Sequence, residues 1–480
     1  MKTFSDFGIA VPDILLPKHV AVESWSCIAC DQYTQDRAYW KNVEKNAASK
    51  PSAYNLILPE VYLEDGNKAA RIAAIKSTMK SYIDDDLFEE KHGFVYVERK
   101  TAYGRLRRGL VVALDLDSYE WQPFATSLVR ATEATIPSRI PPRKEIRNGA
   151  PLETPHIMLL VNDASRTLVE ETGNAVKASG AQSMYSGKLM MNGGSISGWL
   201  VPESHHGALL HALEKIAAAN TAAANMARTA RAMHSATHNA NAAREANTAH
   251  DTNAMREAAA PVEIQADDVF LFAAGDGNHS LATAKAVWDE YKVTLSEEER
   301  ATSRVRYALV EIVNIYDEGL TFEPIHRVVF GADAAELVLR LSATLGGDVV
   351  QCQSQQELED AVKNSTASFG FVSKTGNGTS YTLLKTTIST LAVSLFQPVV
   401  DEYIDEAVRA GKSVSIDYIH GSDEACKLGM QENATGIMLP PIAKDSFFAT
   451  ISACGPLPRK SFSMGEADEK RFYLECRRLF

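Results

Sequence analysis

The junction GDGNHSLATAKAVWDEY, which begins at Gly275, constrains the fold more than any other stretch of this sequence. Before it lies an apolar run, residues 269–274, whose length and composition predict a buried strand. After it, apolar side chains recur at helical spacing at Leu281, Ala284, Trp288 and Tyr291. A strand that passes through a glycine turn into a helix is the unit from which α/β proteins are built. The junction therefore predicts an α/β fold.

The same junction predicts an anion site. The first N–H groups of a helix have no partners, and the helix dipole is positive at that end. Gly275 and Gly277 would let the backbone approach a phosphate closely. Asp276 would project near the helix start, where a carboxylate suits Mg²⁺ or orients a nucleophile. His279 would donate to a phosphate or take part in proton transfer.

A structural interpretation of these residues stays open. Asn278 or Ser280 would then cap the helix, and Asp276 would only shape the turn. The stretch is neither a GxxxxGK[ST] phosphate loop nor a GxGxxG dinucleotide fingerprint. The junction alone does not decide between the two interpretations.

A second constellation, RATEATIPSRIPPRKEIR, favours anion binding. It places Arg130, Arg139, Arg143 and Arg147 around Glu133. Arginine forks match phosphate and carboxylate groups, although a solvated charged loop is the alternative. Prolines at positions 137, 141 and 142 are unfavourable for a long helix, so a shaped loop is expected here.

Bulk composition bounds the class of protein. A chain of 480 residues predicts two or three domains, and 45% hydrophobic with 23% charged residues is ordinary for a globular protein. A net charge of −12 argues against nucleic acid as a partner. The start has no signal-peptide pattern, and no apolar run is long enough to span a bilayer, so a cytoplasmic protein without a membrane partner is expected.

Two further features have plain interpretations. Cys27 and Cys30 form a CxxC without a second pair at metal spacing, which favours structural thiols over zinc, with a redox pair as the alternative. Residues 217–260 are dominated by Ala, Asn and Thr and predict an inserted segment, either a solvated helix or disordered. His234 and His238 within it have i, i+4 spacing, but no third ligand is placed to join them.

Periodicity along the rest of the chain predicts alternating helices and strands. A helix is expected over residues 67–88, and the prolines and glycines punctuate the remainder. Strands are expected at 94–100, 109–117, 157–161, within 184–201, 304–317, 322–330, 413–421, 435–440 and 447–452.

Several stretches in order resemble the DUF1015 family. They are CIACDQYTQDRAYW, LILPEVYLE, RATEATIPSRIPPRKEIR, LMMNGGSISGWL, FAAGDGNHSLATAKAVW, RYALVEIVNIYDEGLTFEPIHRVVF and GPLPRKSFSM. The resemblance covers nearly the whole chain outside the insert. It implies a ParB/sulfiredoxin-like core, a group in which a D-G-H-x motif holds nucleotide phosphates and one branch phosphorylates free L-serine.

Carried over by position, the family motif D-G-H-H-R corresponds to Asp276, Gly277, Asn278, His279 and Ser280. Asn278 thus replaces the first histidine, and Ser280 replaces the arginine, which removes one expected phosphate ligand. The resemblance implies catalytic roles for Asp276 and His279, with Asp276 as the Mg²⁺ ligand and ATP or ADP as the phosphate donor.

The glutamate that activates the acceptor hydroxyl in that branch has Glu133 as its candidate here. Arg130, Arg139 or Arg143 would replace the missing arginine. Asp31 is a further candidate, with a turn or helix cap as its alternative role. Arg459, Lys460 and Arg327 are weaker ones that would reach an anion.

The expected function is that of a small-molecule phosphotransferase resembling a free-serine kinase. The alternative is a non-catalytic regulator that binds a nucleotide or phosphate. A sulfiredoxin-like reductase is disfavoured because the loop from Asp276 to Ser280 has no cysteine. The substrate and the oligomeric state do not follow from the sequence.

The expected fold is α/β with mixed sheets, in three parts. A ParB/sulfiredoxin-like core covers residues 1–330 and contains the 217–260 insert. An additional α/β subdomain covers 331–400. A C-terminal segment, 401–480, returns to the core, because residues 455–464 also carry the resemblance.

Overall fold

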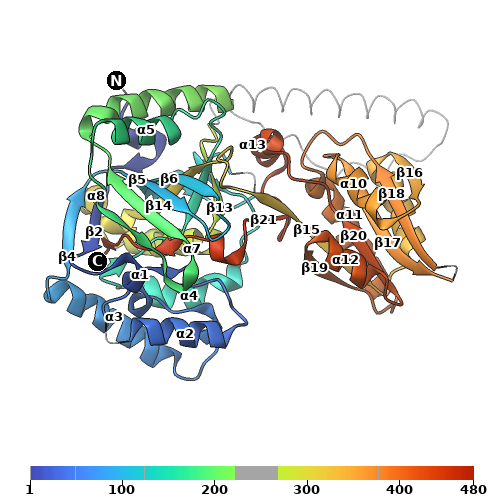
Figure 1. Ribbon diagram of the computed structural model, residues 1–480, viewed down its shortest axis with the longest axis horizontal. Coiled ribbons are helices and arrows are strands. Elements are labelled where there is room, and N and C mark those ends of the chain that lie inside the picture. The colour runs from blue at the N-terminus through green and yellow to red at the C-terminus, as the bar shows by residue number, and fades with distance from the viewer. Residues whose placement is uncertain (1, 49, 124, 222–268, 377) are drawn as a thin grey trace.

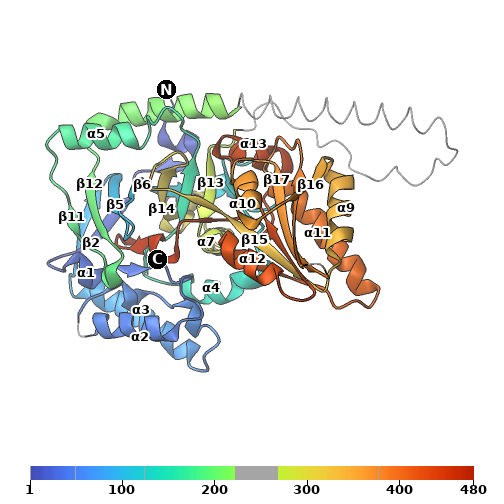
Figure 2. The same ribbon diagram turned by 45° about the vertical axis from the view of Figure 1, so that its right-hand side comes forward.

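The computed structural model describes residues 2–48, 50–123, 125–221, 269–376 and 378–480. Two sheets organise this part of the chain, and strand β15 (Phe322–Phe330) belongs to the second sheet while reaching back toward the first (Figures 1 and 2). The predicted insert lies outside the described residues from position 222 onward, and with it the pair His234 and His238. The predicted class, an α/β protein with mixed sheets, is confirmed.

The first sheet is mixed and has ten strands among the described residues. Its order is β11 (Tyr185–Lys188), β12 (Ser195–Leu200), β5 (Val95–Lys100), β6 (Leu106–Asp115), β14 (Tyr307–Asn314), β10 (Met158–Val161), β13 (Phe272–Asp276), β8 (Val129–Ala131) and β7 (Tyr119–Glu120), with β1 (Ile9–Ala10) beside β6. Parallel pairs join β10 to β14, β13 to β8 and β7 to β8.

The middle strands of this sheet are buried on both faces, which explains why they are continuously apolar in the sequence. In β10, Leu159 and Val161 belong to one core cluster, and Met158 and Leu160 to another. The second cluster is completed by helix α13 (Lys444–Cys454), so the C-terminal region packs against this sheet.

Helix α13 corrects the expectation of a strand at residues 447–452. Phe447, Phe448 and Ile451 are buried on one side of the helix. The sequence DSFFATIS is compatible with either period over so short a run, and packing of these side chains against the first sheet decides for the helix. Each such side chain contributes roughly 1.5–3 kcal/mol by leaving water.

The second sheet is antiparallel throughout. Its order is β16 (Asp348–Cys352), β18 (Gly378–Lys385), β17 (Ser368–Thr375), β20 (Ala434–Met438), β15 and β19 (Ser415–His420), with β21 (Phe462–Met464) pairing the start of β15. Helices α9 (Ala334–Leu345) and α11 (Ala392–Arg409) share one apolar cluster with it. Helices α10 (Gln355–Lys363) and α12 (Ser422–Gly429) share another, through Val372 on the opposite face from Phe371.

Most of the remaining helices and strands contribute side chains to the core cluster of the first sheet. These remaining elements include α1 (Val22–Trp25), α2 (Arg37–Ala47), α3 (Lys68–Asp84), α5 (Glu170–Ala178), α8 (Glu297–Thr302), β2 (Asp13–Pro17), β3 (Cys27–Ile28), β4 (Phe88–His92) and β9 (Leu152–Glu153). Residues 206–221 are also helical. Within the described ranges, no helix has the length and apolar character needed to cross a membrane.

The segment predicted as a shaped loop, 130–147, ends in a helix. A 3-10 turn, Pro137–Arg139, leads directly into α4 (Ile140–Arg147). Pro141 and Pro142 lie in the first turn of α4, where the missing N–H groups would have had no helical partner anyway. The prolines therefore fix where this helix begins.

Sheet membership also shows where the three predicted parts of the chain lie. The second sheet starts with β15 at residue 322 and includes strands up to β21, which ends at Met464, so it extends on both sides of the expected 331–400 subdomain. Beyond it, β22 (Phe472–Tyr473) pairs with β3, and β23 (Arg477–Arg478) pairs with β9.

Candidate functional site

The site begins where β13 passes into α7 (Asn278–Lys292). Gly277 is the N-cap of this helix and has φ +76°, the left-handed conformation that glycine adopts without strain. A Cβ at this position would lie 3.1 Å from Ile157 Cα, so the turn is also packed tightly against the strand beside it. As N-cap, Gly277 brings no side chain to the first-turn N–H groups, which keeps them available to an anion.

Gly275, Asn278 and Ser280, the other predicted phosphate-binding residues of the motif, each contact a different part of the protein. Gly275 faces the core, since a Cβ there would lie 2.8 Å from Leu160 Cγ. Ser280 Oγ lies 3.0 Å from His156 Nε2, and Asn278 Nδ2 donates to Thr132 Oγ1 over 3.4 Å. Neither Asn278 nor Ser280 caps the helix, which removes the structural interpretation of these two residues.

Asp276 lies in a cluster of charges. Its Oδ2 is 3.6 Å from Lys470 Nζ and is buried without a hydrogen-bond partner among the described residues. Burial raises the pKa of Asp276, and Lys470 offsets part of that shift. Asp31 and His156 also act on this carboxylate, so four ionisable side chains from separate parts of the chain meet at the start of α7.

Asp31 belongs to this cluster and does not cap a helix. His156 Nε2 lies 3.9 Å from its Oδ2, and Gln32 donates to its Oδ1 over 3.0 Å. Burial opposes ionisation of Asp31, but His156, Gln32 and Lys470 together outweigh it, so the pKa of Asp31 is lowered. Asp31 is therefore an anion at neutral pH. The neighbouring helix α2 is capped by Asp36 instead.

Buried arginine contacts fix the backbone on both sides of Lys470. The buried guanidinium of Arg99 donates to the carbonyl oxygens of Glu469, at 2.8 Å, and of Lys470 itself. The next residue, Arg471, is paired with Glu311 at 2.6 Å between Nε and Oε2. These buried contacts fix the chain on either side of Lys470, so its ammonium is held toward Asp276.

Glu133 lies on the loop after β8, beside the same lysine. Its Oε1 accepts a hydrogen bond from the N–H of Ser461 over 3.2 Å, and its backbone bridges to Leu457. Burial raises its pKa to about 7, against the opposing effects of three peptide N–H groups and of Lys470. A carboxyl that titrates near neutral pH is well matched to accept a proton.

His279 is held as a neutral imidazole. Its Nε2 accepts a hydrogen bond from the N–H of Ile136 over 3.2 Å, which places the ring proton on Nδ1. Burial, together with the nearby charges of Arg143 and Arg139, lowers its pKa to about 4. At neutral pH, His279 is therefore a hydrogen-bonding group and carries no positive charge.

The structure separates the three predicted anion-binding arginines. Arg139 and Arg143 act electrostatically on His279 and so lie close to the start of α7. Arg143 forms an ion pair with Glu60. Arg130 is elsewhere: it donates to the Ser127 carbonyl over 2.9 Å, and its guanidinium lies over the ring of Phe270, 4.7 Å from the centroid.

The weaker candidates gather around one aromatic ring on β19. The cationic groups of Arg327, Arg459 and Lys460 lie 4.5, 5.6 and 5.3 Å from the centroid of Tyr418. Arg327 is fully buried; burial lowers its pKa to about 10, and the nearby carboxylate of Glu133 is one of the groups that oppose this shift. His326, beside it, accepts from the N–H of Leu439 over 3.1 Å and is a satisfied core histidine.

The two cysteines of the CxxC lie in surroundings that keep their thiols protonated. Cys27 and Cys30 are free thiols, and burial raises the pKa of Cys30 to about 12, which disfavours the reactive thiolate. Across the described ranges, no three His, Cys, Asp or Glu side chains are placed to hold a metal ion on their own.

Sequence reasoning missed three members of the site: His156, Lys470 and Tyr473. His156 is linked to Tyr473, whose OH lies 3.0 Å from the His156 Nδ1. His156 directly precedes β10, next to the junction in the sheet, and this is a signal that topology supplies and spacing does not. Lys470 and Tyr473 are some 190 residues beyond the motif and stand in no recognisable pattern.

Fold and geometry together define a mixed α/β protein in which buried charged side chains gather at a strand–helix junction. The family described as "Protein of unknown function (DUF1015)" matches residues 13–405. The chain belongs to this family, as the sequence motifs predicted. The search among curated proteins found no match.

Partial likenesses to solved structures accompany this match. A conserved hypothetical protein from Pyrococcus furiosus aligns at 15% identity, over 44% of this chain and 75% of its own, with a TM-score of 0.27. A free serine kinase in complex with AMP aligns at 14% identity, over 42% of this chain and 71% of its own, with a TM-score of 0.27. A variant of a free serine kinase in complex with ADP aligns at 15% identity, over 42% of this chain and 72% of its own, with a TM-score of 0.28. Structural similarities this low do not assign a function to this chain.

Proposed function

We propose that this protein is a phosphotransferase that moves a phosphoryl group from a nucleotide to the hydroxyl of a small molecule. The observation that carries the proposal is Glu133, a carboxyl with a pKa of about 7 that shares Lys470 with the carboxylate at the start of α7. A base beside a cationic, N–H-lined anion site is the arrangement that phosphoryl transfer to an alcohol requires.

The chain's own groups divide the work as follows. The first-turn N–H groups of α7 and the ammonium of Lys470 would bind phosphoryl oxygens. Glu133 would take the proton of the acceptor hydroxyl as that oxygen bonds to phosphorus and the bond to the departing nucleotide oxygen breaks. Neutral His279 would orient an oxygen through its Nδ1–H.

Asp276 fits a divalent cation. One of its oxygens is buried without a hydrogen-bond partner among the described residues, and Asp31 adds a second carboxylate nearby. Mg²⁺ in phosphoryl-transfer sites is held by one or two carboxylates together with substrate phosphates, so a third protein ligand is not needed. When bound, Mg²⁺ would neutralise charge on the phosphates.

The first acceptor to test is free L-serine, which the sequence motifs suggest, alongside other amino acids and small alcohols. The protein is incubated with ATP or ADP and Mg²⁺, and products are followed by phosphorus NMR. A new phosphomonoester is expected with the wild type and with Asp289→Asn, a matched change on the exposed face of α7. The same product should be missing with Asp276→Asn.

The second candidate is a regulator that binds a nucleotide or phosphate without turnover. Two cations of the site already have carboxylate partners within the protein, Arg143 with Glu60 and Lys470 with Asp276. These ion pairs favour the second candidate, because they compete with catalytic use of the same cations. Nucleotide binding that persists in Glu133→Gln, with no phosphomonoester from any acceptor in the wild type, would select the regulator. Absence of nucleotide binding would reject both functions.

A further inference from the structure

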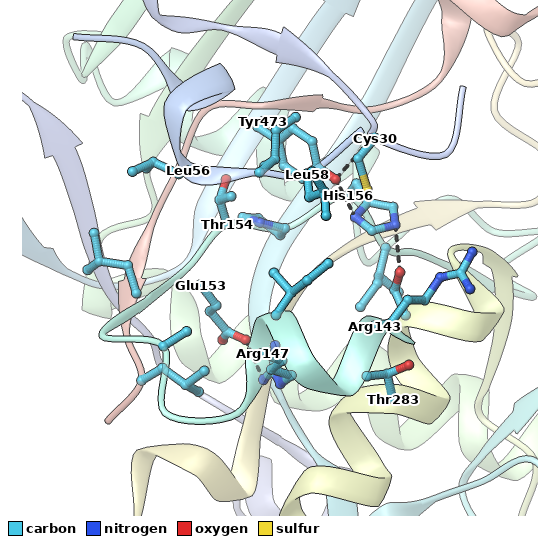
Figure 3. Close-up of a pocket in the computed structure, with 18 of the residues that line it drawn as sticks. Cys30, Leu56, Leu58, Arg143, Arg147, Glu153, Thr154, His156, Thr283 and Tyr473 are labelled. Carbon is cyan, nitrogen blue, oxygen red and sulfur yellow. Dashed lines mark hydrogen bonds and ion pairs between the residues drawn. The ribbon is translucent and has the colours of Figure 1, made fainter. Parts of the chain in front are cut away.

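A cavity of about 140 Å³ lies next to the proposed site, beside helix α4 (Figure 3). Its walls come from the segment around Leu58, from α3, from α4, from the chain entering β10 and from the second turn of α7. Aliphatic side chains dominate the lining: Leu56, Ile57, Leu58, Leu63, Met79, Ile146, Leu152, Ile157, Leu309 and Leu479. We call this cavity the apolar pocket.

The apolar pocket and the anion site share residues. Ser280, in the first turn of α7, lines the pocket. His156 also lines it, and its ring acts electrostatically on Asp276. Arg143 lines the pocket as well and acts on His279. Figure 3 shows His156 and Arg143 on the same side of the pocket. A ligand with a phosphate at the start of α7 therefore has an apolar chamber within reach.

Several polar side chains on the pocket wall already interact with other groups of the protein. Thr283 Oγ1 donates to the His279 carbonyl over 2.7 Å, and Thr154 Oγ1 donates to the Glu475 carbonyl over 3.2 Å. At the opposite end, Arg147 pairs with Glu153 at 2.6 Å. Most of the lining surface is therefore hydrocarbon, which suits a flat, weakly polar group more than a sugar or a second phosphate.

The size of the pocket narrows the class of ligand. A single water occupies on the order of 10–15 Å³ of such space, so the pocket corresponds to about ten water-sized spheres. An adenine base has about the same number of non-hydrogen atoms, whereas a serine side chain has far fewer. The volume thus matches the base of a nucleotide.

We propose that the apolar pocket holds the purine base of the nucleotide whose phosphates bind at the N-terminus of α7. The inference rests on the proposed function, because it assigns a second subsite to the same ligand. The sugar would lie beside His156 and Arg143, between the two subsites. The base would be recognised by its shape and apolar contacts.

The test compares ADP with pyrophosphate, which lacks the base, by isothermal titration calorimetry in the presence of Mg²⁺. The wild type should bind ADP at least tenfold more tightly. Ile146→Trp places a large ring into the pocket from α4 and should weaken ADP binding at least tenfold while pyrophosphate binding is unchanged. Glu145→Trp, on the exposed side of the same helix, is the matched control and should bind both probes as the wild type does.

Equal affinity of the wild type for ADP and pyrophosphate would overturn the base subsite and leave the phosphate site standing. So would unchanged ADP binding by Ile146→Trp. Failure of the wild type to bind either probe would instead contradict the proposed function. Because overpacking can disturb folding, a second readout uses the wild type alone. Photolabelling with 8-azido-ATP should mark peptides containing 56–58 or 146–157, and labels confined to other peptides would overturn the inference.

Discussion

At the scale of single residues, Glu133 is the side chain whose protonation most directly reports on the proposed chemistry. Its carboxyl has a pKa of about 7 because it is buried beside peptide N–H groups and one lysine. If Glu133 is the base, kcat/KM for phosphoryl transfer should rise with pH and level off above a midpoint near 7. Glu133→Gln should lower kcat/KM by roughly 10²–10⁴-fold. A variant that keeps the wild-type rate and midpoint would exclude Glu133 as the base.

The same carboxyl makes folding stability depend on pH. Its folded-state pKa, about 7, is above the ordinary value of 4.5, so the folded state holds the proton more tightly. The stabilisation is complete below pH 4.5 and is lost as pH rises through 7, by on the order of 3 kcal/mol. Urea unfolding of the wild type and Glu133→Gln at pH 5 and pH 8 measures this loss. The variant should gain relative stability at pH 8, and a pH-independent difference would contradict the burial of this carboxyl.

Lys470 is the cation that both Asp276 and Glu133 experience. Replacing it by methionine removes a charge that lowers the pKa of each carboxyl, so the midpoint of the pH–rate profile should move upward. Phosphate affinity should fall as well. Lys460→Met is the control, because Lys460 is exposed and its ammonium lies over Tyr418. An unmoved midpoint in Lys470→Met would separate this lysine from the base.

At the scale of elements, the turn between β13 and α7 depends on glycine for two separable reasons. Gly277 and Gly104 have nearly the same conformation, with φ of +76° and +79°. Only at Gly277 would a Cβ meet backbone, at 3.1 Å from Ile157 Cα, since nothing lies within 4 Å of a Cβ at Gly104. Gly104→Ala should cost about 1–2 kcal/mol for the left-handed backbone alone.

Gly277→Ala should cost more than Gly104→Ala, and it should also weaken phosphate binding, because the first turn of α7 must shift. Thermal unfolding and calorimetry of the two variants measure both effects. Equal losses of stability, with phosphate binding retained, would show that the packing against Ile157 has no role at this turn.

The elements show how far sequence reasoning reaches. The strand, turn and helix at the junction are predictable because each has its own local signal, namely an apolar run, glycines and helical spacing. The sequence predicts a loop where α4 forms, because proline breaks a helix at most positions but is tolerated in the first turn, where Pro141 and Pro142 lie. Helix α13 was expected as a strand because its short run fits both periods and tertiary packing decides.

The residues of the candidate site likewise fall into those that local motifs predict and those that only the tertiary structure brings in. Asp276, Glu133 and His279 come from motifs, and the structure gathers them around the start of α7. The positive charge of Arg130 predicts an anion ligand, but its guanidinium instead lies over the ring of Phe270, and this contact depends on which face of β8 the side chain occupies. Lys470 enters the site through strand pairing and buried arginine contacts far along the chain, which no local pattern encodes.

At the scale of the whole molecule, the last residues of the chain complete the core laid down by the first. Strand β22 pairs with β3 near the N-terminus, and β23 pairs with β9. Directly before β22, Arg471 pairs with Glu311 on β14, and in β23 Arg477 pairs with Glu153 at 2.5 Å. The segment from 466 to 480 thus both completes the core and supplies Lys470 to the site.

A chain that ends at Gly465 should therefore not reach the folded state. Glu311 would lose Arg471 and Glu153 would lose Arg477, which leaves each buried carboxylate with one remaining arginine, Arg107 and Arg147 respectively. Breaking a buried ion pair costs up to about 3–5 kcal/mol, and the pairing of β22 and β23 is lost as well, so the total is comparable with the whole stability of a domain. Circular dichroism and size-exclusion chromatography should show an expanded chain without a cooperative transition. Removal of Phe480 alone is the control, because its side chain is 42% exposed and the ion pairs stay intact. A cooperatively folded chain ending at Gly465 would show that the core forms without its C-terminal segment, and adding a peptide of residues 466–480 to it should then restore the site that contains Lys470.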